Sequence, residues 1–211
     1  MEAEAGMSRG SAIRRILKWL LSPVLLTRGP RGRIYLTFDD GPVLESTPRI
    51  LDVLDTYGAK ATFFMVGSQM KQHPSLVAEV RSRGHTIGYH SFEHHHAGAY
   101  SFRAELRDLA SVREIAGEPR GAIRHYRPPY GELTLMRLAW CLTNRMSVAM
   151  WSLDSRDSFI RSPDELVQKV SPANVRDGEV ILFHDDSEAT LEALPKILEN
   201  LKNAGFSFSS L

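Results

Sequence analysis

The sequence predicts an α/β fold in which a parallel sheet or barrel is covered by helices. Short runs of β-branched and aromatic residues alternate along the chain with longer segments whose apolar residues recur at helical spacing. Such alternation is typical of βα units, whose strands lie parallel to one another. The length of 211 residues, of which 43% are hydrophobic, is sufficient for one sizeable core, so we expect a single globular domain.

The first half of the chain has the pattern of three strand–helix pairs. Each expected strand is a β-branched and aromatic run, and each expected helix ends at a glycine. In order, the pairs are a strand at 33–38 with a helix at 46–58, a strand at 61–67 with a helix at 74–84, and a strand at 85–90 with a helix at 102–117. Ser46 or Thr47 can cap the first helix, and Pro48 suits its first turn.

The second half follows the same plan with one interruption. Two prolines in "HYRPPYG" (125–131) exclude a central strand through that whole segment, because proline cannot donate a ladder hydrogen bond. The elements expected after it are, in order, a helix at 133–145, a strand at 147–154, a helix at 162–173, a strand at 178–186, a helix at 190–205 and a short strand at 206–211.

We divide the chain into a leader, residues 1–32, and one domain, residues 33–211. Within the leader, residues 13–26 have basic residues before an apolar run. The run is too short for a membrane-spanning helix and contains Lys18 and Pro23, and no convincing signal-peptide cleavage site follows it. Two interpretations stay open: a short helix on an anionic membrane surface, or a helix packed on the domain or a partly ordered leader.

Composition excludes some classes of partner and bond. A formal net charge of +1 gives no reason to expect nucleic acid or a strongly acidic partner. The single cysteine, Cys141, excludes an intramolecular disulfide and fits a reducing compartment.

Polar residues gather where the expected strands end. In parallel α/β architectures these carboxyl ends converge on one face, which is where ligands bind. The residues at or just beyond such ends are Asp39, Asp40, His90, Asp154, Asp157, His184 and Asp185. The sequence therefore predicts one site built from side chains that are far apart in the chain.

Two clusters in this pattern indicate a metal ion. The neighbouring carboxylates of Asp39 and Asp40 repel each other unless a cation lies beside them. His90 and His94 lie four residues apart, so a helical turn after the strand would aim both imidazoles the same way. Two imidazoles with one carboxylate are a usual ligand set for a catalytic zinc-like ion.

The histidine cluster also permits another interpretation. "HSFEH" (90–94) matches the H-x-x-E-H pattern of inverzincin peptidases, in which Glu93 would be the general base. That pattern requires a long helix, whereas the segment before it has a strand pattern, so we rank it lower. We interpret His95 and His96 as part of a solvated loop.

Five segments resemble, in the same order, the motifs of the polysaccharide deacetylase family, the carbohydrate esterases with a NodB-like homology domain. The segments are "TFDDGP" (37–42), "HSFEH" (90–94), "RPPYG" (127–131), "DSRDS" (154–158) and "ILFH" (181–184). The resemblance covers nearly the whole chain, from about residue 33 to its end.

The resemblance implies a deformed (β/α) barrel with about seven parallel strands, fewer than the eight of a regular barrel. It also implies a metal-dependent hydrolase that cleaves a carbon–nitrogen bond outside peptides. The group removed would be an N-acetyl, less often an O-acetyl, on an amino sugar of an oligo- or polysaccharide or a glycolipid precursor. Zinc is the expected ion, with cobalt, nickel or manganese as alternatives. We expect a cytoplasmic or peripheral inner-membrane location in a bacterium.

The resemblance assigns a role to each motif residue. The metal ligands would be Asp40, His90 and His94. The catalytic residues would be Asp39 as general base, Arg127 as its orienting partner, Tyr130 as a backbone oxyanion donor, and His184 as general acid held by Asp157. The substrate-binding residues would be Pro129, Trp151, Ile181 and Leu182.

The sequence departs from the motifs at Ser158, where the family has Trp, and at Ile181, where it has Leu. We therefore expect a groove that is more open near Ser158 or is walled by Trp151 and Phe159 instead.

Two other functions stay open. One is a deformylase or other amide hydrolase that acts on a lipid-linked sugar, which the basic and apolar N-terminus would suit. The other is a catalytically silent carbohydrate-binding relative, against which the complete Asp/His/His set argues. The sequence predicts neither the sugar nor the oligomeric state.

Overall fold

A computed structural model describes residues 24–97, 99, 101–117 and 123–211 of the chain. In this part of the chain, nine strands form one sheet in which every pair is parallel. The strands are β1 (Leu25–Leu26), β2 (Ile34–Asp39), β3 (Thr62–Met65), β4 (Thr86–Tyr89), β5 (His125–Tyr126), β6 (Ser147–Ala149), β7 (Leu153–Asp154), β8 (Val180–His184) and β9 (Phe208–Ser209). Their order is β1-β6-β5-β4-β3-β2-β8-β7, and β9 pairs with the start of β2.

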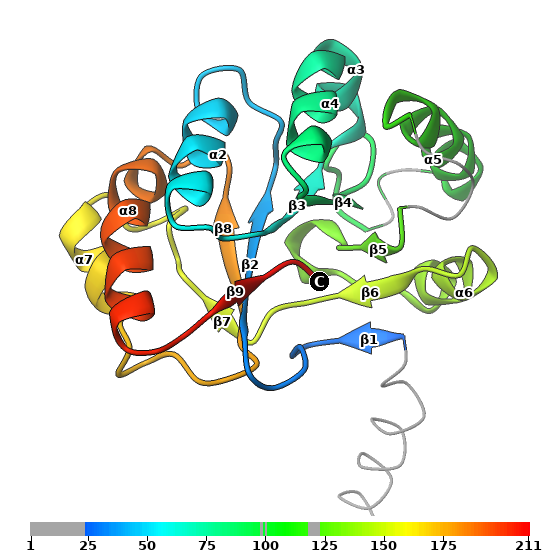
Figure 1. The fold of residues 1–211 in the computed structure, drawn as a ribbon. Coiled ribbons are helices and arrows are strands. Elements are labelled where there is room, and N and C mark those ends of the chain that lie inside the picture. The colour runs from blue at the N-terminus through cyan, green and yellow to red at the C-terminus, as the bar shows by residue number, and fades with distance from the viewer. Residues whose placement is uncertain (1–23, 98, 100, 118–122) are drawn as a thin grey trace, which may run out of the picture.

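Helices lie around the outside of this curled sheet (Figure 1). They are α2 (Thr47–Thr56), α3 (Gly67–Gln72), α4 (Pro74–Ser82), α5 (Phe102–Ile115), α6 (Leu135–Thr143), α7 (Pro163–Lys169) and α8 (Glu188–Asn203), together with a 3-10 turn, η1 (Pro129–Gly131). The deformed (β/α) barrel is thereby confirmed. The sheet has nine strands where about seven were expected, and four of the nine are short pairings of only two residues.

Alternation along the strands separates the hydrophobic core from the interior of the barrel. Phe38 of β2 stacks on Phe63 of β3 and Phe183 of β8, with ring centroids 5.1 and 5.5 Å apart, and all three belong to the buried core. The neighbouring positions of β2, Thr37 and Asp39, point to the other side, where both contact Arg127. The inward positions of the strands therefore carry the polar groups.

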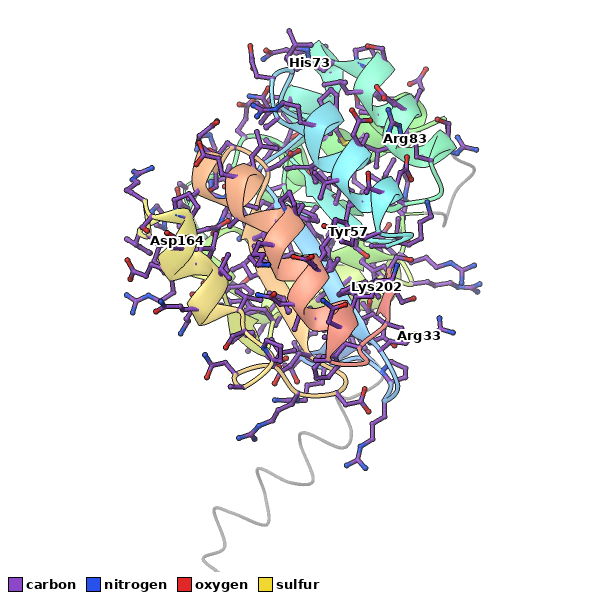
Figure 2. The ribbon with its side chains drawn as sticks, turned by 60° about the vertical axis from the view of Figure 1, so that its left-hand side comes forward. Arg33, Tyr57, His73, Arg83, Asp164 and Lys202 are labelled. Carbon is purple, nitrogen blue, oxygen red and sulfur yellow. The ribbon has the colours of Figure 1, made fainter. Side chains whose placement is uncertain are left out.

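The outer helices bury one face each. In Figure 2, α2 and α8 lie side by side over the sheet, and Lys202 of α8 donates a hydrogen bond of 3.1 Å to the Tyr57 carbonyl. The hydroxyl of Ser187 caps α8 by accepting from the Thr190 N–H. At the start of α2, Ser46 occupies the cap position without a side-chain cap bond.

The single strand expected at 147–154 is wrong. The structure divides this segment into β6, which pairs with β1 and β5, and β7, which pairs with β8 at the other end of the sheet. The residues between them cross the open side of the barrel, and the Met150 and Ala149 carbonyls accept hydrogen bonds from Arg127 instead of from a neighbouring strand.

The sheet begins earlier than the predicted start of the domain at residue 33. β1 pairs with β6 through Leu25 opposite Val148 and Leu26 opposite Ala149. The rest of the segment 13–26, interpreted as a membrane-surface or packed helix, lies outside the described residues except for its last three positions. Within the described ranges, no helix has the length and apolarity needed to span a bilayer.

Candidate active site

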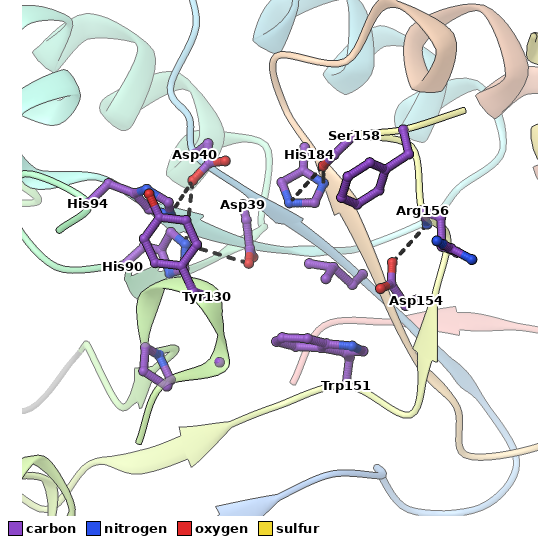
Figure 3. Close-up of a pocket in the computed structure, with 14 residues that line it drawn as sticks. Asp39, Asp40, His90, His94, Tyr130, Trp151, Asp154, Arg156, Ser158 and His184 are labelled. Atoms are coloured by element: carbon purple, nitrogen blue, oxygen red, sulfur yellow. Dashed lines mark hydrogen bonds and ion pairs between the residues drawn. The ribbon is translucent and has the colours of Figure 1, made fainter. Parts of the chain in front are cut away.

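A pocket of about 420 Å³ opens where the strands end (Figure 3). Of the residues predicted from the sequence, those that line it are Asp39, Asp40, His90, His94, Tyr130, Trp151, Leu182 and His184. Arg127 and Asp157 lie behind them, buried and hydrogen-bonded to Asp39 and His184. The fold thus brings together side chains from β2 and β8 and from the loops after β2, β4, β5, β6 and β7.

Both adjacent aspartates face this pocket because the backbone turns between them. Successive residues of a strand point to opposite sides, so a continued strand would send Asp40 away from Asp39. Asp40 instead has φ 72°, in the left-handed region, and this turn brings its carboxylate back to the pocket. Four of the six non-glycine residues with positive φ among the described residues, Asp40, His94, Tyr130 and Arg156, line the same pocket. Such clustering is typical of functional sites.

Asp40, His90 and His94 form a compact set of donor atoms, all within 4.8 Å of one another. Asp40 Oδ1 lies 3.4 Å from His90 Nε2 and 3.2 Å from His94 Nε2. The segment from 91 to 96 is not helical, so the helical turn considered above is wrong. A turn in which the Ser91 hydroxyl accepts from the His94 N–H brings the two imidazoles together instead.

The protonation of these groups fits a cation. His90 Nδ1 lies 2.8 Å from the Arg127 carbonyl, which can only accept, so Nδ1 carries the proton and Nε2 of the neutral ring has a free lone pair. Burial lowers the pKa of His94 and favours its neutral form as well. Asp40 Oδ1 is buried and has no hydrogen-bond partner. Two nitrogen lone pairs and a carboxylate oxygen that converge without a shared proton match the donors of a divalent ion.

Arg127 is fully buried and fixes the second aspartate. Its Nη1 donates to Asp39 Oδ1 at 2.7 Å and to Thr37 Oγ1 at 2.8 Å. Its guanidinium stacks 4.1 Å from the centroid of the Phe64 ring. A buried cation requires a paired anion, so this contact pairs the guanidinium and holds the Asp39 carboxylate in place.

His184 and Asp157 form a second ion pair beside Asp39. His184 is the register partner of Asp39 on the adjacent strand, so the two side chains start next to each other. Its Nδ1 lies 2.7 Å from Asp157 Oδ1, and Asp157 Oδ2 accepts from the His184 backbone N–H and the Thr190 hydroxyl. Burial lowers the pKa of His184, but Asp157, Asp39 and Asp40 outweigh it and raise the pKa to about 9. His184 is therefore protonated at neutral pH.

Tyr130 closes the side of the pocket next to the metal donors. Its ring stacks on His96, with centroids 3.8 Å apart, and lies 4.8 Å from the ring of His94. His96 Nδ1 in turn lies 3.1 Å from Glu132. His96 lies exposed in a loop, as expected, and its imidazole also supports the Tyr130 ring. The proposed role of the Tyr130 backbone N–H stays a prediction.

The family model for polysaccharide deacetylase matches residues 27–144, more than half of the chain. The chain belongs to the polysaccharide deacetylase family. It is 33% identical over 200 residues to a peptidoglycan-N-acetylglucosamine deacetylase of Bacillus cereus, covering 92% of this chain and 72% of the relative. It is 34% identical over 194 residues to a chitooligosaccharide deacetylase of Rhizobium leguminosarum bv. trifolii, covering 84% and 89%.

A solved structure supports the same assignment. It is a peptidoglycan N-acetylglucosamine deacetylase in complex with 4-naphthalen-1-yl-N-oxidanyl-benzamide. The two folds superpose with a TM-score of 0.84 at 31% identity, over 92% of this chain and 94% of the other.

Two substrate-binding residues suggested by the polysaccharide deacetylase motifs do not reach the pocket. Pro129 is buried, and the wall is formed by its neighbour Pro128. Ile181 lies in the core, because alternation along β8 turns it outward and turns Leu182 inward. Leu182 and Trp151 both line the pocket as expected.

Ser158, which departs from the polysaccharide deacetylase motif, also lines the pocket. Its hydroxyl lies 3.1 Å from His184 Nδ1, and the small side chain leaves part of the imidazole facing the pocket. Trp151 and Phe159, the two aromatic residues proposed as substitute walls, both line the pocket, and Phe159 is 76% exposed. The groove of this family member is therefore walled by aromatic rings on either side of an open position.

Two residues that shape the site, Thr37 and Asp185, had no role predicted from the sequence. Thr37 links Arg127 to the Ile181 carbonyl, but in the sequence it is only one β-branched residue of a strand. Asp185 is buried, and its Oδ2 accepts from the Thr47 hydroxyl at 2.6 Å. Burial and the charges of nearby aspartates raise its pKa to about 7. Asp185 was noticed only as a strand-end residue, and its position beside the loop after β2 depends on tertiary contacts.

Proposed function

We propose that the protein is a metal-dependent N-deacetylase that hydrolyses the acetamido group of an amino sugar in an oligo- or polysaccharide or a glycolipid precursor. Its relatives are named for peptidoglycan and chitooligosaccharide substrates. One observation carries the proposal: a set of cation donors, a carboxylate held by a buried arginine and a protonated histidine surround a single pocket.

The first half of the reaction needs a Lewis acid and a base. Asp40, His90 and His94 would hold a divalent ion, which would supply the polarisation of the amide carbonyl and the lowered pKa of water. Asp39 lies beside this site, with Oδ2 3.7 Å from His90 Nε2. Arg127 holds its other oxygen, so Asp39 is positioned to accept the proton of the attacking water.

The second half needs a proton at the leaving nitrogen. His184 faces the pocket on the other side of Asp39 in Figure 3 and is protonated at neutral pH. Asp157 binds its Nδ1 and leaves Nε2 to donate to the leaving amine. The Tyr130 backbone N–H is proposed to stabilise the negative oxygen that develops on the carbonyl.

The walls of the pocket suit a sugar. Tyr130, Trp151 and Phe159 provide flat apolar surfaces, which pack well on the apolar faces of sugar rings, and Leu182 is proposed to contact the acetyl methyl. Zinc is the proposed ion, since two imidazoles and one carboxylate are ligands that zinc accepts in catalytic sites. Cobalt, nickel and manganese are alternatives that metal reconstitution distinguishes.

Acetate release from chitotetraose by the metal-reconstituted protein tests the proposal. We expect Asp39→Asn to lower kcat by about 100-fold or more, the usual contribution of a general base, while elemental analysis shows retained metal. Glu93→Gln is the matched control, because Glu93 is exposed and would be the base only in the peptidase interpretation. Full turnover by Asp39→Asn, or its loss in Glu93→Gln, contradicts the proposed mechanism.

The two alternatives are separated by the same assay. A silent sugar-binding relative releases no acetate from any sugar, although the complete donor set argues against it. A deformylase releases formate instead, which mass spectrometry of a lipid-linked formamido sugar detects. Peripheral contact of residues 13–26 with the bacterial inner membrane is likewise proposed, and sedimentation with anionic vesicles, with and without residues 1–23, tests it.

A further inference from the structure

A second hollow adjoins the active-site pocket. It has a volume of about 620 Å³, and its lining includes Arg156, Phe159, Arg161, Glu165 and Lys169. Arg156 and Phe159 also line the active-site pocket, so the two hollows lie side by side and meet at these two side chains. A substrate longer than one sugar unit can therefore extend from the first hollow into the second.

The second hollow is positively charged. Arg156, Arg161 and Lys169 face it together with a single carboxylate, Glu165. Within the described part of the chain, none of these three cations is within salt-bridge distance of an acidic group. Their charges are therefore free for a ligand, whereas the arginine deeper in the site, Arg127, is fully used by Asp39 and backbone carbonyls.

Arg156 is held at the junction by a fixed turn. Its backbone has φ 63°, its N–H donates to Asp154 Oδ1 at 2.8 Å, and its carbonyl accepts from the Phe159 and Ile160 N–H groups. Its guanidinium lies 5.8 Å from the centroid of the Phe159 ring. Figure 3 shows Arg156 at the end of the pocket away from His90 and His94.

We propose that this hollow binds an anionic group, a phosphate or a carboxylate, that the substrate carries next to the sugar that is deacetylated. The inference rests on the proposed function and specifies its substrate class. Guanidinium groups bind both kinds of anion through paired hydrogen bonds, which an ammonium alone cannot supply. The second hollow offers three cations against a single carboxylate, Glu165, so an anion next to the reacting sugar is stabilised there.

Three substrates test the inference: neutral chitotetraose, chitobiosyl phosphate, and the disaccharide of N-acetylglucosamine with N-acetylmuramic acid, which carries a carboxylate. For the double variant Arg156→Ala/Arg161→Ala, we expect the ratio of kcat/KM for an anionic sugar to that for chitotetraose to fall about fivefold or more, as for one or two exposed charge pairs. The phosphate and carboxylate arms show which anion the groove prefers. Raising the ionic strength should lower the same ratio in the unaltered protein.

Matched variants and a binding measurement complete the test. Arg124→Ala removes an exposed arginine outside both hollows and should leave the ratio unchanged, whereas Glu165→Gln should raise it. Dissociation constants measured by calorimetry in the Asp39→Asn protein give the corresponding ratio of affinities for an anionic sugar and for chitotetraose, without turnover. An unchanged ratio in Arg156→Ala/Arg161→Ala overturns the inference and leaves the deacetylase proposal standing. Absence of acetate from all three sugars overturns the proposed function, while the calorimetric ratio still decides the anion site.

Discussion

Two histidines of the same pocket, His94 and His184, hold protons differently. Burial lowers the pKa of His94, which favours the neutral form that binds a cation. Burial acts on His184 in the same direction, but contact with Asp157 and the charges of Asp39 and Asp40 outweigh it and raise the pKa to about 9. The surroundings, and not the residue type, therefore favour a neutral imidazole at His94 and a protonated one at His184, as the proposed roles require.

We expect Asp157→Asn to lower the pKa of His184 from about 9, because the contact with Asp157 is lost and only the charges of Asp39 and Asp40 still oppose burial. Acetate release at pH 7 should fall by about 100-fold, the usual contribution of a general acid. An NMR titration of the imidazole in metal-free protein measures the pKa, with the exposed Asp164→Asn as control. A His184 that still titrates near pH 9 in the Asp157→Asn variant would contradict the assignment.

The same pair makes folding stability depend on pH. The pKa of His184 in the folded chain, about 9, lies above the ordinary value of 6.5, so folding favours the bound proton. The stabilisation is complete below pH 6.5 and is lost as the pH rises through about 9. Across this window, denaturant titrations should show a larger decrease in the free energy of unfolding for the unaltered protein than for Asp157→Asn. Equal decreases in the two proteins would show that the pair does not stabilise the fold.

At this scale the motifs supply the chemical groups but not their directions. Asp39, Asp40 and His184 were predicted from residue type and from their position at strand ends. The inward or outward facing of Ile181 and Leu182 depends on the register of β8, which a run of apolar residues does not reveal. The hydrogen bonds of Thr37 are equally invisible, because they join residues far apart in the chain.

The turn after β2 is the element on which the site depends most directly. A Cβ atom at Gly41 would lie 1.9 Å from Asp185 Oδ2, so only glycine allows the turn to pack against this carboxylate. The Asp185 N–H also donates to the Asp39 carbonyl at 2.8 Å. The loops after β2 and β8 therefore hold each other in position, with Asp39 and Asp40 between them.

We expect Gly41→Ala to lower the free energy of unfolding by about 1–3 kcal/mol, the usual range for overpacking, and to reduce acetate release because Asp40 is displaced. A double-mutant cycle with Asp185→Ala isolates the contact. In the double variant the clash is absent, so the two effects should be less than additive. Strict additivity, measured by denaturant unfolding, would rule out this packing as the cause.

Elements with a strong local pattern were predicted well, and those shaped by distant contacts were not. Helices α2, α5 and α8 follow their apolar spacing. The division of 147–154 into β6 and β7 depends on Arg127, which takes up the carbonyls of Ala149 and Met150. No pattern within 147–154 contains that information.

At the scale of the whole molecule, the donor set links metal binding to stability. Asp40 comes from the end of β2, and His90 and His94 come from the loop after β4, so an ion bound by all three would join two parts of the sheet. A ligand that binds only the folded chain stabilises it by about 4 kcal/mol at 1,000 times its dissociation constant.

We therefore expect zinc to raise the melting temperature of chelator-treated protein, measured by calorimetry. His94→Ala should lose most of this increase because one of the three donors is gone. His96→Ala, which removes a neighbouring imidazole outside the donor set, should keep it. An equal increase in His94→Ala would place the ion elsewhere.

The overall architecture was predictable because every strand–helix unit carries its own pattern, and parallel order follows from their alternation. The opening of the barrel was not predictable from the sequence. It lies between β1 and β7, the two strands at the ends of the sheet, which do not pair with each other.

Arg127 donates both to Asp39 and to the two carbonyls beside that opening. The Arg127 guanidinium therefore positions the Asp39 carboxylate and also fixes the backbone of Ala149 and Met150 at the opening of the barrel. A substitution of Arg127 that abolishes activity is ambiguous, because it removes the support of Asp39 and destabilises the fold at the same time. A folded, inactive reference protein for crystallography or inhibitor screening is better made by changing Asp39 alone.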